Sequence, residues 1–309
     1  MKYDLSVTTG MLMDWTYTES INHQIERITN AGFKFLDFSF DSWVNEANSN
    51  VTKSPFLLQN WESWIESAKE TAEKNGARFN QGHAPASVFS CGTDYDLYIK
   101  YVKRAIDCCN ILGIKWLVHH AVTYPNQFGS SLSWLEFNKK AFCEILEYSK
   151  KKNVGVAIEN MWPVWKLYDR EQWNTEILIE LVDNLNDDLV GICWDTGHGN
   201  LTANARGFKL CNHPELLEYG NQYNEIIKMG KRLKCLHIHD NNGMDDDHIL
   251  PFTGSINWKD VMRGLSDIQY TGAFTYEANS FIENLPEECK DDAIRLMYSV
   301  GKSLIEMNF

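Results

Sequence analysis

The chain has 309 residues, of which 44% are hydrophobic and 23% charged, and 29 basic against 42 acidic side chains leave a formal net charge of −13. This composition is typical of globular proteins, and the acidic balance argues against a nucleic-acid partner, which usually binds a basic surface. No apolar stretch approaches the ~20 residues needed to span a bilayer. Because residues 1–4 lead directly into a strand pattern, we expect a cytoplasmic protein without a leader segment.

Short runs rich in β-branched and aromatic residues alternate along the chain with longer segments of helical periodicity. The short runs predict strands at residues 4–9, 33–40, 77–85, 114–120, 154–160, 189–195, 233–240 and 272–278. The longer segments predict helices at residues 20–32, 55–76, 95–113, 130–153, 173–186, 214–232, 257–267 and 286–307.

Eight successive strand–helix units in a chain of this length are the pattern of a (β/α)8 TIM barrel, an α/β fold. We expect it to form one domain over residues 1–309. A doubly wound sheet would carry a glycine-rich turn after the first strand. Residues 9–12 (TGML) contain a single glycine there, so the barrel is the better interpretation.

The sixth predicted strand ends in residues 193–200 (CWDTGHGN), which hold an Asp-x-x-His pair and two glycines. We expect the chain to turn sharply on these glycines. A carboxylate and an imidazole at the tip of a strand are ligands that divalent metals accept. One such motif is as easily an Asx-type turn with a solvated histidine, so the interpretation depends on the other strands.

Five other predicted strands also end in acidic residues or histidines. Seven of the nine histidines fall at strand ends or in the adjoining loop at 241–254. In a TIM barrel the C-terminal ends of the strands form the active site, and carboxylates packed there would repel one another without cations. The sequence therefore predicts a metal site built from His83, His119, Glu159, Asp195, His198, His237, Asp246, His248 and Glu277.

The types of ligand narrow the choice of metal. Three carboxylates and one imidazole suit Mn²⁺, Mg²⁺, Co²⁺ or Zn²⁺, and this set comprises Glu159, Asp195, His237 and Glu277. The further histidines favour zinc and more than one ion. His237 and His239 project from the same face of one strand, so either can be the ligand, whereas His120 should point away from His119.

These residues resemble those of the xylose-isomerase-like TIM barrel superfamily, which contains sugar isomerases and epimerases as well as endonuclease IV. The resemblance extends over nearly the whole chain. The stretches that carry it are 82–85 (GHAP), 118–119 (VH), 158–160 (IEN), 194–198 (WDTGH), 237–241 (HIHDN), 246–248 (DDH) and 276–277 (YE).

The resemblance implies different sites in the two branches of the superfamily. In the epimerase branch, one divalent ion is held by the positions of Glu159, Asp195, His237 and Glu277, and the two glutamates act as acid and base on opposite faces of a sugar. The His-x-x-acid pattern of the superfamily, completed here by Asp240, favours His237 over His239 as the ligand. In the endonuclease branch, all nine residues named above match positions that hold three zinc ions.

Other features favour a small carbohydrate over DNA. The segment 247–258 (DHILPFTGSINW) is similar to the isomerase-like branch, and the repair enzymes have an arginine where this chain has Asp247. Sugar rings stack well on aromatic side chains, and tryptophans near the strands or their following loops are Trp15, Trp43, Trp116, Trp162 and Trp165. The epimerase pattern also has an arginine shortly after the seventh strand. Residues 241–244 (NNGM) lack it, which favours another member of the superfamily.

The sequence thus predicts a metal-dependent sugar isomerase or epimerase with Mn²⁺ or Zn²⁺ as cofactor. Glu159 or Glu277 would remove a proton between two metal-held oxygens, and the other glutamate would return it to the enediolate. Lyase or dehydratase chemistry needs the same first step. The predicted substrate-binding residues are His239, Asn160 and Trp162.

The alternative is an endonuclease IV-like zinc phosphodiesterase that acts at abasic DNA sites, and a catalytically silent binding barrel is a third interpretation. The partners we expect are a small carbohydrate and, at most, further copies of the same chain. No phosphate-binding cluster of basic residues stands out at the strand ends, which favours a free sugar or polyol.

Overall fold

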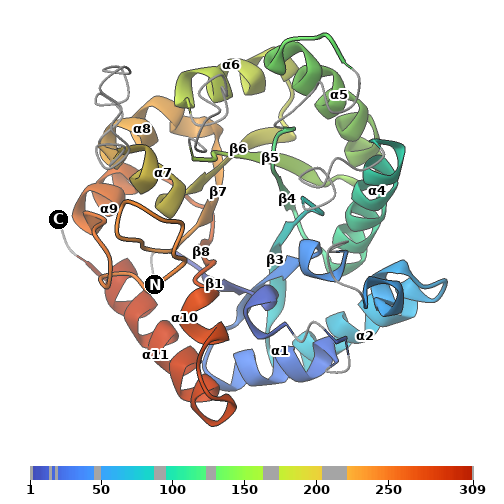
Figure 1. The fold of residues 1–309 in the computed structure, drawn as a ribbon, viewed down its shortest axis with the longest axis vertical. Helices are drawn as coiled ribbons and strands as arrows, with labels where there is room; N and C mark the ends of the chain where they lie inside the picture. The colour runs from blue at the N-terminus through green and yellow to red at the C-terminus, as the bar shows by residue number, and fades with distance from the viewer. Residues whose placement is uncertain are drawn as a thin grey trace.

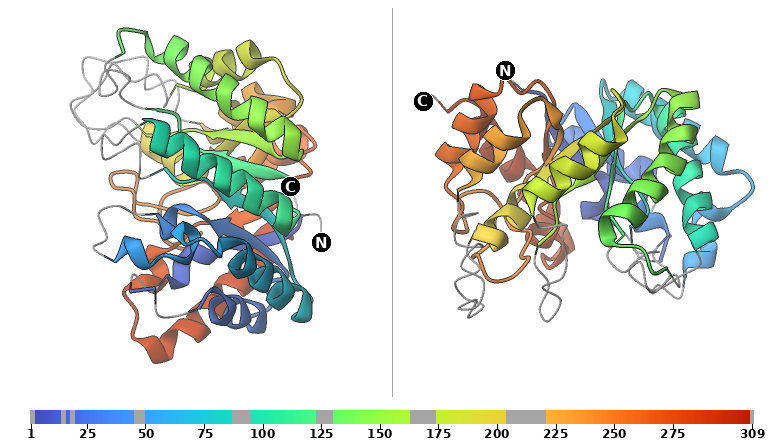
Figure 2. Two further views of the ribbon diagram at one scale, coloured as in Figure 1. Left: turned by 90° about the vertical axis from the view of Figure 1, so that its right-hand side faces the viewer. Right: turned by 90° about the horizontal axis from the view of Figure 1, so that it is seen from above.

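The computed structural model describes residues 3–13, 16–17, 20–44, 50–86, 95–122, 130–162, 174–203 and 221–307. It shows the predicted (β/α)8 barrel, with the strands inside a ring of helices (Figures 1 and 2). Within these residues, parallel strands form one eight-stranded sheet in the order β7-β6-β5-β4-β3-β2-β1-β8. Ile238 closes the ring, since its N–H donates to the carbonyl of Thr275 (2.8 Å) and its carbonyl accepts the N–H of Glu277 (3.1 Å).

Every predicted strand is present and is slightly shorter than its sequence pattern. The strands are β1 (Leu5–Thr8), β2 (Phe35–Ser39), β3 (Arg78–His83), β4 (Trp116–His119), β5 (Gly155–Glu159), β6 (Val190–Asp195), β7 (Leu233–His237) and β8 (Phe274–Tyr276). The helices are α1 (Ile21–Asn30), α2 (Trp61–Lys74), α4 (Tyr95–Leu112), α5 (Trp134–Lys152), α6 (Thr175–Leu185), α7 (Thr196–Ala203), α8 (Gln222–Met229), α9 (Trp258–Asp267), α10 (Ser280–Glu283) and α11 (Glu287–Ile305).

The ends of α5 show how local chemistry fixes the elements. Ser133 Oγ accepts the N–H of Glu136, and the Glu136 carboxylate accepts the N–H of Ser133, which together form a capping box. At the other end the helix stops at Asn153, which has a left-handed conformation with φ 55°. Of the helix predicted at 214–232, residues 214–220 lie outside the described residues.

The side chains inside the barrel follow from the alternation of the strands. Four buried residues from neighbouring strands pack together apart from the main core: Val118, Ala157, Cys193 and Cys235. Because side chains alternate between the two faces of a strand, the residue two positions further along each strand should also point inward, at the C-terminal mouth. Those residues are His120, Glu159, Asp195 and His237.

The prediction of a sharp turn at residues 196–199 was wrong, because α7 begins directly after Asp195. The two glycines lie in this helix, and they are needed for close packing. A Cβ atom at Gly197 would lie 1.9 Å from Cε1 of His239, and one at Gly199 would lie 2.4 Å from the ring of Trp194. Within the described part of the chain, no helix combines the length and the apolar character needed to cross a membrane.

Candidate active site

Four of the predicted ligands meet at the mouth of the barrel. One ligand atom from each of Glu159, Asp195, His237 and Glu277 lies within 4.8 Å of the other three. Nδ1 of His237 is 2.9 Å from Glu159 Oε1 and 3.1 Å from Glu277 Oε2. Glu159 and Asp195 are completely buried, whereas the side chain of Glu277 is 18% exposed. We call these four residues the first cluster; a ligand entering from the mouth would meet Glu277.

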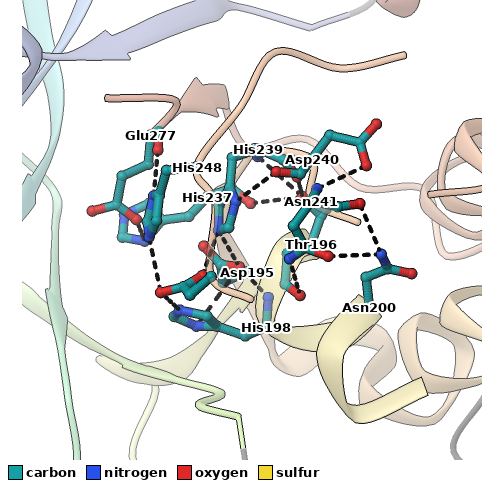
Figure 3. A network of polar contacts seen from close by, with 12 residues as sticks. Asp195, Thr196, His198, Asn200, His237, His239, Asp240, Asn241, His248 and Glu277 are labelled. Atoms are coloured by element: carbon teal, nitrogen blue, oxygen red, sulfur yellow. Dashed lines mark hydrogen bonds and ion pairs between the residues drawn. The ribbon is translucent and has the colours of Figure 1, made fainter. Parts of the chain in front are cut away.

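A second cluster lies beside the first and consists of His198, His239, Asp246 and His248, whose ligand atoms also fall within 4.8 Å of one another. Figure 3 shows its three histidines next to Asp195. The rings of His239 and His248 are stacked, with centroids 3.9 Å apart and an interplanar angle of 10°. His239 Nε2 lies 3.0 Å from Asp195 Oδ1, so the two clusters are in direct contact.

The histidines of the second cluster are oriented by the backbone. Nδ1 of His198 faces the carbonyl of Asn160 at 2.8 Å, and Nδ1 of His248 faces the carbonyl of Glu277 at 2.6 Å. Nδ1 of His239 faces the carbonyl of Asp240 at 3.3 Å. When the ring is neutral, the nitrogen beside a carbonyl carries the proton, and Nε2 is then the nitrogen that can bind an ion. This is how histidines that bind metals are commonly held.

A third group joins the first cluster through Glu159 and contains His83 and His120. Nε2 of His120 lies 3.1 Å from Glu159 Oε2 and 3.2 Å from Nε2 of His83. Nδ1 of His83 faces the carbonyl of Ala84 at 2.8 Å. Glu159 therefore contacts imidazoles on two sides, and sequence reasoning missed His120.

His119, predicted as a ligand, points the other way. In the sheet it pairs with Ile158, so both side chains face the surrounding helices, and its ring packs edge-on against Phe142 of α5. Burial and the nearby His83 and His120 lower the pKa of His119 to about 3, so the ring is neutral. The alternation from Val118 was the available signal, because it places His120 on the inner face.

The predicted substrate-binding residues differ in their surroundings. The ring of Trp162 lies 4.5 Å from that of His198 at the edge of the second cluster. Asn160 instead holds β6 in place, since its side chain accepts the N–H of Asp195 (2.6 Å) and donates to the carbonyl of Asp195 (3.1 Å). His239 is fully buried in the second cluster. Trp15 and Trp165 lie outside the described residues.

Asp240, which completes the sequence pattern, anchors the loop after β7. Its carboxylate accepts hydrogen bonds from the N–H groups of Asn241, Phe252 and Ile256 and from the indole of Trp258, at 2.9–3.1 Å. This accounts for the role of Trp258 in the segment 247–258. The loop is thereby fixed so that Asp246 and His248 face the mouth.

The residues fit a divalent ion. Asp195 Oδ2 is buried and has no hydrogen-bond partner within the described residues. Three further buried atoms make no hydrogen bond there and have only ion-pair contacts at 3.0–3.7 Å: Glu159 Oε2, His239 Nε2 and Asp246 Oδ1. Buried polar atoms without a partner are rare in native proteins. Carboxylate oxygens and imidazole nitrogens suit manganese and zinc, so a bound ion would satisfy these atoms.

In the metal-free protein, protonated imidazoles compensate the negative charges of the carboxylates in the clusters. Burial opposes the charging of the rings, but facing carboxylates outweigh it and raise the pKa of His83 to about 9, of His198 to about 10 and of His248 to about 9. Conversely, burial would raise the pKa of Glu277, but His237 outweighs it and lowers that pKa. An ion that binds must displace the imidazole protons, so its affinity increases with pH.

We expect the metal-free protein to lose stability as the pH rises from 6.5 to about 10. The folded-state pKa values of His83, His198 and His248 lie above the unfolded value of 6.5, so their stabilisation is complete below pH 6.5 and is lost as the pH passes through the folded values. One such shift is worth roughly 3 kcal/mol, and because the three histidines share carboxylate partners we expect a total loss of at least that size. Urea unfolding at pH 6.5, 8 and 10 with a chelator measures it; a free energy of unfolding that stays constant or increases contradicts it.

Comparisons with known proteins agree with this architecture. A family model described as a xylose isomerase-like TIM barrel matches residues 25–299. The uncharacterised protein y4fM of Sinorhizobium fredii is 25% identical over 292 residues, which cover 84% of this chain and 82% of that protein. A fructoselysine 3-epimerase of Escherichia coli O157:H7 is 24% identical over 161 residues, 46% of this chain and 58% of that protein. The solved structure of a D-tagatose 3-epimerase-like protein matches with a TM-score of 0.70, at 20% identity and 98% coverage of both chains.

Proposed function

The chain belongs to the xylose isomerase-like TIM barrel family, and from that premise we propose that it is a metal-dependent isomerase or epimerase of a sugar or sugar-like substrate. The observation that carries the proposal is the convergence of Glu159 and Glu277 on Nδ1 of His237, at 2.9 and 3.1 Å, from different strands. Two carboxylates placed in this way suit the removal of a proton at one position and its return at another. One of the similar proteins is named a fructoselysine 3-epimerase, and another is named a D-tagatose 3-epimerase-like protein.

The first cluster would hold the ion required for this chemistry. A divalent ion bound there would polarise neighbouring substrate oxygens and acidify the C–H bond between them. Its three carboxylates and one imidazole suit manganese or zinc. The second cluster, with three imidazoles and one carboxylate, has the four nitrogen and oxygen ligands of a closed zinc site, and we propose that it holds a second ion.

Each of the two glutamates would carry out one of the two proton transfers. Both glutamates have a lowered pKa, and Glu277 is the one that is partly exposed, so we assign it as the base that first meets the substrate. Glu159 is buried, and its Oε2 lies 3.1 Å from Nε2 of His120. Glu159 would then deliver a proton to the substrate from another direction. Transfer of a proton to the opposite face of a carbon inverts it, whereas transfer to the neighbouring carbon isomerises the sugar.

The surroundings of the site favour a sugar over an abasic DNA strand. Asp245 and Asp247 flank Asp246 on the loop at the mouth, and Asp245 is exposed, so this loop would repel a phosphate backbone. His239 would also provide a fourth protein ligand for an ion in the second cluster. A phosphate oxygen would need an open coordination position there. We therefore propose a small carbohydrate as the substrate.

Hydrogen exchange at carbon tests the proposal even though the natural substrate is unidentified. The protein, loaded with manganese or zinc, is incubated in deuterated water with a panel of ketoses that includes D-tagatose, and the products are followed by NMR. We expect deuterium to replace the hydrogen next to the carbonyl and an epimer or isomer to accumulate. An abasic duplex serves as the comparison, and its cleavage without any exchange in the sugars would contradict the proposal.

A further inference from the structure

A layer of buried polar side chains lies inside the barrel directly below the first cluster. It consists of Asp37 of β2, Gln81 of β3 and Thr275 of β8, which are 1%, 2% and 0% exposed. Gln81 stands two residues before His83, and Thr275 two residues before Glu277, so this layer is one step further from the mouth. Gln81 Nε2 donates to Asp37 Oδ2 at 2.8 Å, and Thr275 Oγ1 donates to Gln81 Oε1 at 3.4 Å.

The carboxylate of Asp37 is incompletely satisfied. Its Oδ1 has no hydrogen-bond partner in the part of the chain that the structure describes. Over the same residues, its ion-pair partner is His237, whose Nε2 lies 3.8 Å from Asp37 Oδ2. A buried carboxylate is costly unless it is paired and hydrogen-bonded, so the place of Asp37 beneath His237 calls for an explanation beyond packing.

His237 differs from the other histidines of the site in how it is held. His83, His198, His239 and His248 each place Nδ1 next to a backbone carbonyl. His237 instead directs Nδ1 toward Glu159 and Glu277 in the first cluster. Its other nitrogen, Nε2, faces Asp37. If Nδ1 binds an ion, the remaining ring proton must be on Nε2, the nitrogen that points to a carboxylate.

We propose that Asp37 is the positioning residue of the first cluster: its carboxylate faces Nε2 of His237 at 3.8 Å and electrostatically favours the ring form with the proton on Nε2, which orients His237 and increases the basicity of its Nδ1. This inference rests on the proposed function, because it requires an ion at the first cluster. A carboxylate behind a metal-binding histidine fixes the ring and strengthens the ligand, and its loss commonly weakens metal binding about 10- to 100-fold. Gln81, by donating to Asp37, keeps the carboxylate under the ring.

The Asp37→Asn variant tests the proposal, because asparagine preserves the size of the side chain and removes its charge. We expect the dissociation constant of zinc, measured by competition with a chromophoric chelator, to increase about 10- to 100-fold. The free energy of unfolding of the metal-free variant is measured beside it, because the variant also loses the ion pair with His237. A purely structural role for Asp37 predicts a changed free energy of unfolding with unchanged zinc affinity, and unchanged zinc affinity would overturn the inference.

Thr275→Val provides a matched control, because it alters the same layer at constant volume without touching the charge. Its zinc affinity should equal that of the wild type, and a loss as large as that of Asp37→Asn would overturn the inference. If Asp37→Asn does not fold, the zinc affinity of Gln81→Met is measured instead, because this variant lacks the donor that holds Asp37. Weaker zinc binding by Gln81→Met supports the proposal, and unchanged binding contradicts it. A wild-type protein that binds no ion refutes the proposed function itself, whereas wild-type binding matched by Asp37→Asn refutes only the role of Asp37.

Discussion

Replacement of Glu159 by glutamine should lower turnover by at least 10²- to 10⁴-fold, roughly the range expected for loss of a general acid–base group. The amide cannot exchange a proton with the substrate. It also removes the negative charge that faces His237 on one side and His120 and His83 on the other, so the metal content should fall as well. The rate of deuterium incorporation into the ketose measures the first effect, and elemental analysis of the purified variant measures the second.

Glu225→Gln is the matched control for this experiment. Glu225 is also a buried glutamate, 2% exposed, but it lies in α8 and pairs with Lys228 at 3.2 Å. We expect this variant to exchange deuterium at the wild-type rate. If Glu159→Gln also kept the wild-type rate, then both the isomerase mechanism and the metal-assisted phosphodiesterase would lose their central residue.

Protein purified without chelator should contain more than one divalent ion per chain, and His248→Ala should contain one ion fewer than the wild type. The reason is that His248 belongs to the second cluster alone, whereas the first cluster keeps its four ligands in the variant. An ion at a free concentration 1,000 times its dissociation constant adds about 4 kcal/mol to the free energy of unfolding. Removal of the ions by a chelator should therefore lower the melting temperature by many degrees.

His23→Ala controls for nonspecific loss of metal, because His23 lies in α1, outside the clusters that could hold an ion. Its metal content should match that of the wild type. One ion in both the wild type and His248→Ala would mean that the second cluster is held by hydrogen bonds between its imidazoles and carboxylate. Identification of the metal in the same measurement separates manganese from zinc.

The order of the strands and the first cluster could be predicted from the sequence because they depend on local patterns. An apolar run indicates a strand, and a barrel brings the C-terminal ends of its strands together. The positions of Glu159 and Glu277 at strand ends were therefore sufficient to predict that these residues lie close together. The direction in which a side chain at a strand end points could not be predicted in the same way. It depends on the register of the strand, and a shift by one residue places His119 instead of His120 on the inner face.

Contacts between strands that are far apart in the chain could not be predicted from the sequence. The glycines of α7 looked like turn residues, because nothing nearby in the sequence indicates that His239 occupies the space beside Gly197. Asp37 likewise appeared as one polar residue in an apolar strand, and its contact with His237 exists only once β2 and β7 lie in the same barrel. Local patterns determine the elements, whereas the partners of buried polar groups depend on tertiary packing.

The closure of the barrel through Ile238 has a consequence for the order of events during synthesis. β8 is the last strand to leave the ribosome, and it meets β7 through the hydrogen bonds of Ile238 with Thr275 and Glu277. Glu277 therefore joins Glu159, Asp195 and His237 only after nearly all of the chain has emerged, and such long-range contacts form late. A complete first cluster would thus mark a finished barrel, so a truncated or nicked chain that lacks β8 should release its metal even where its other helices and strands persist.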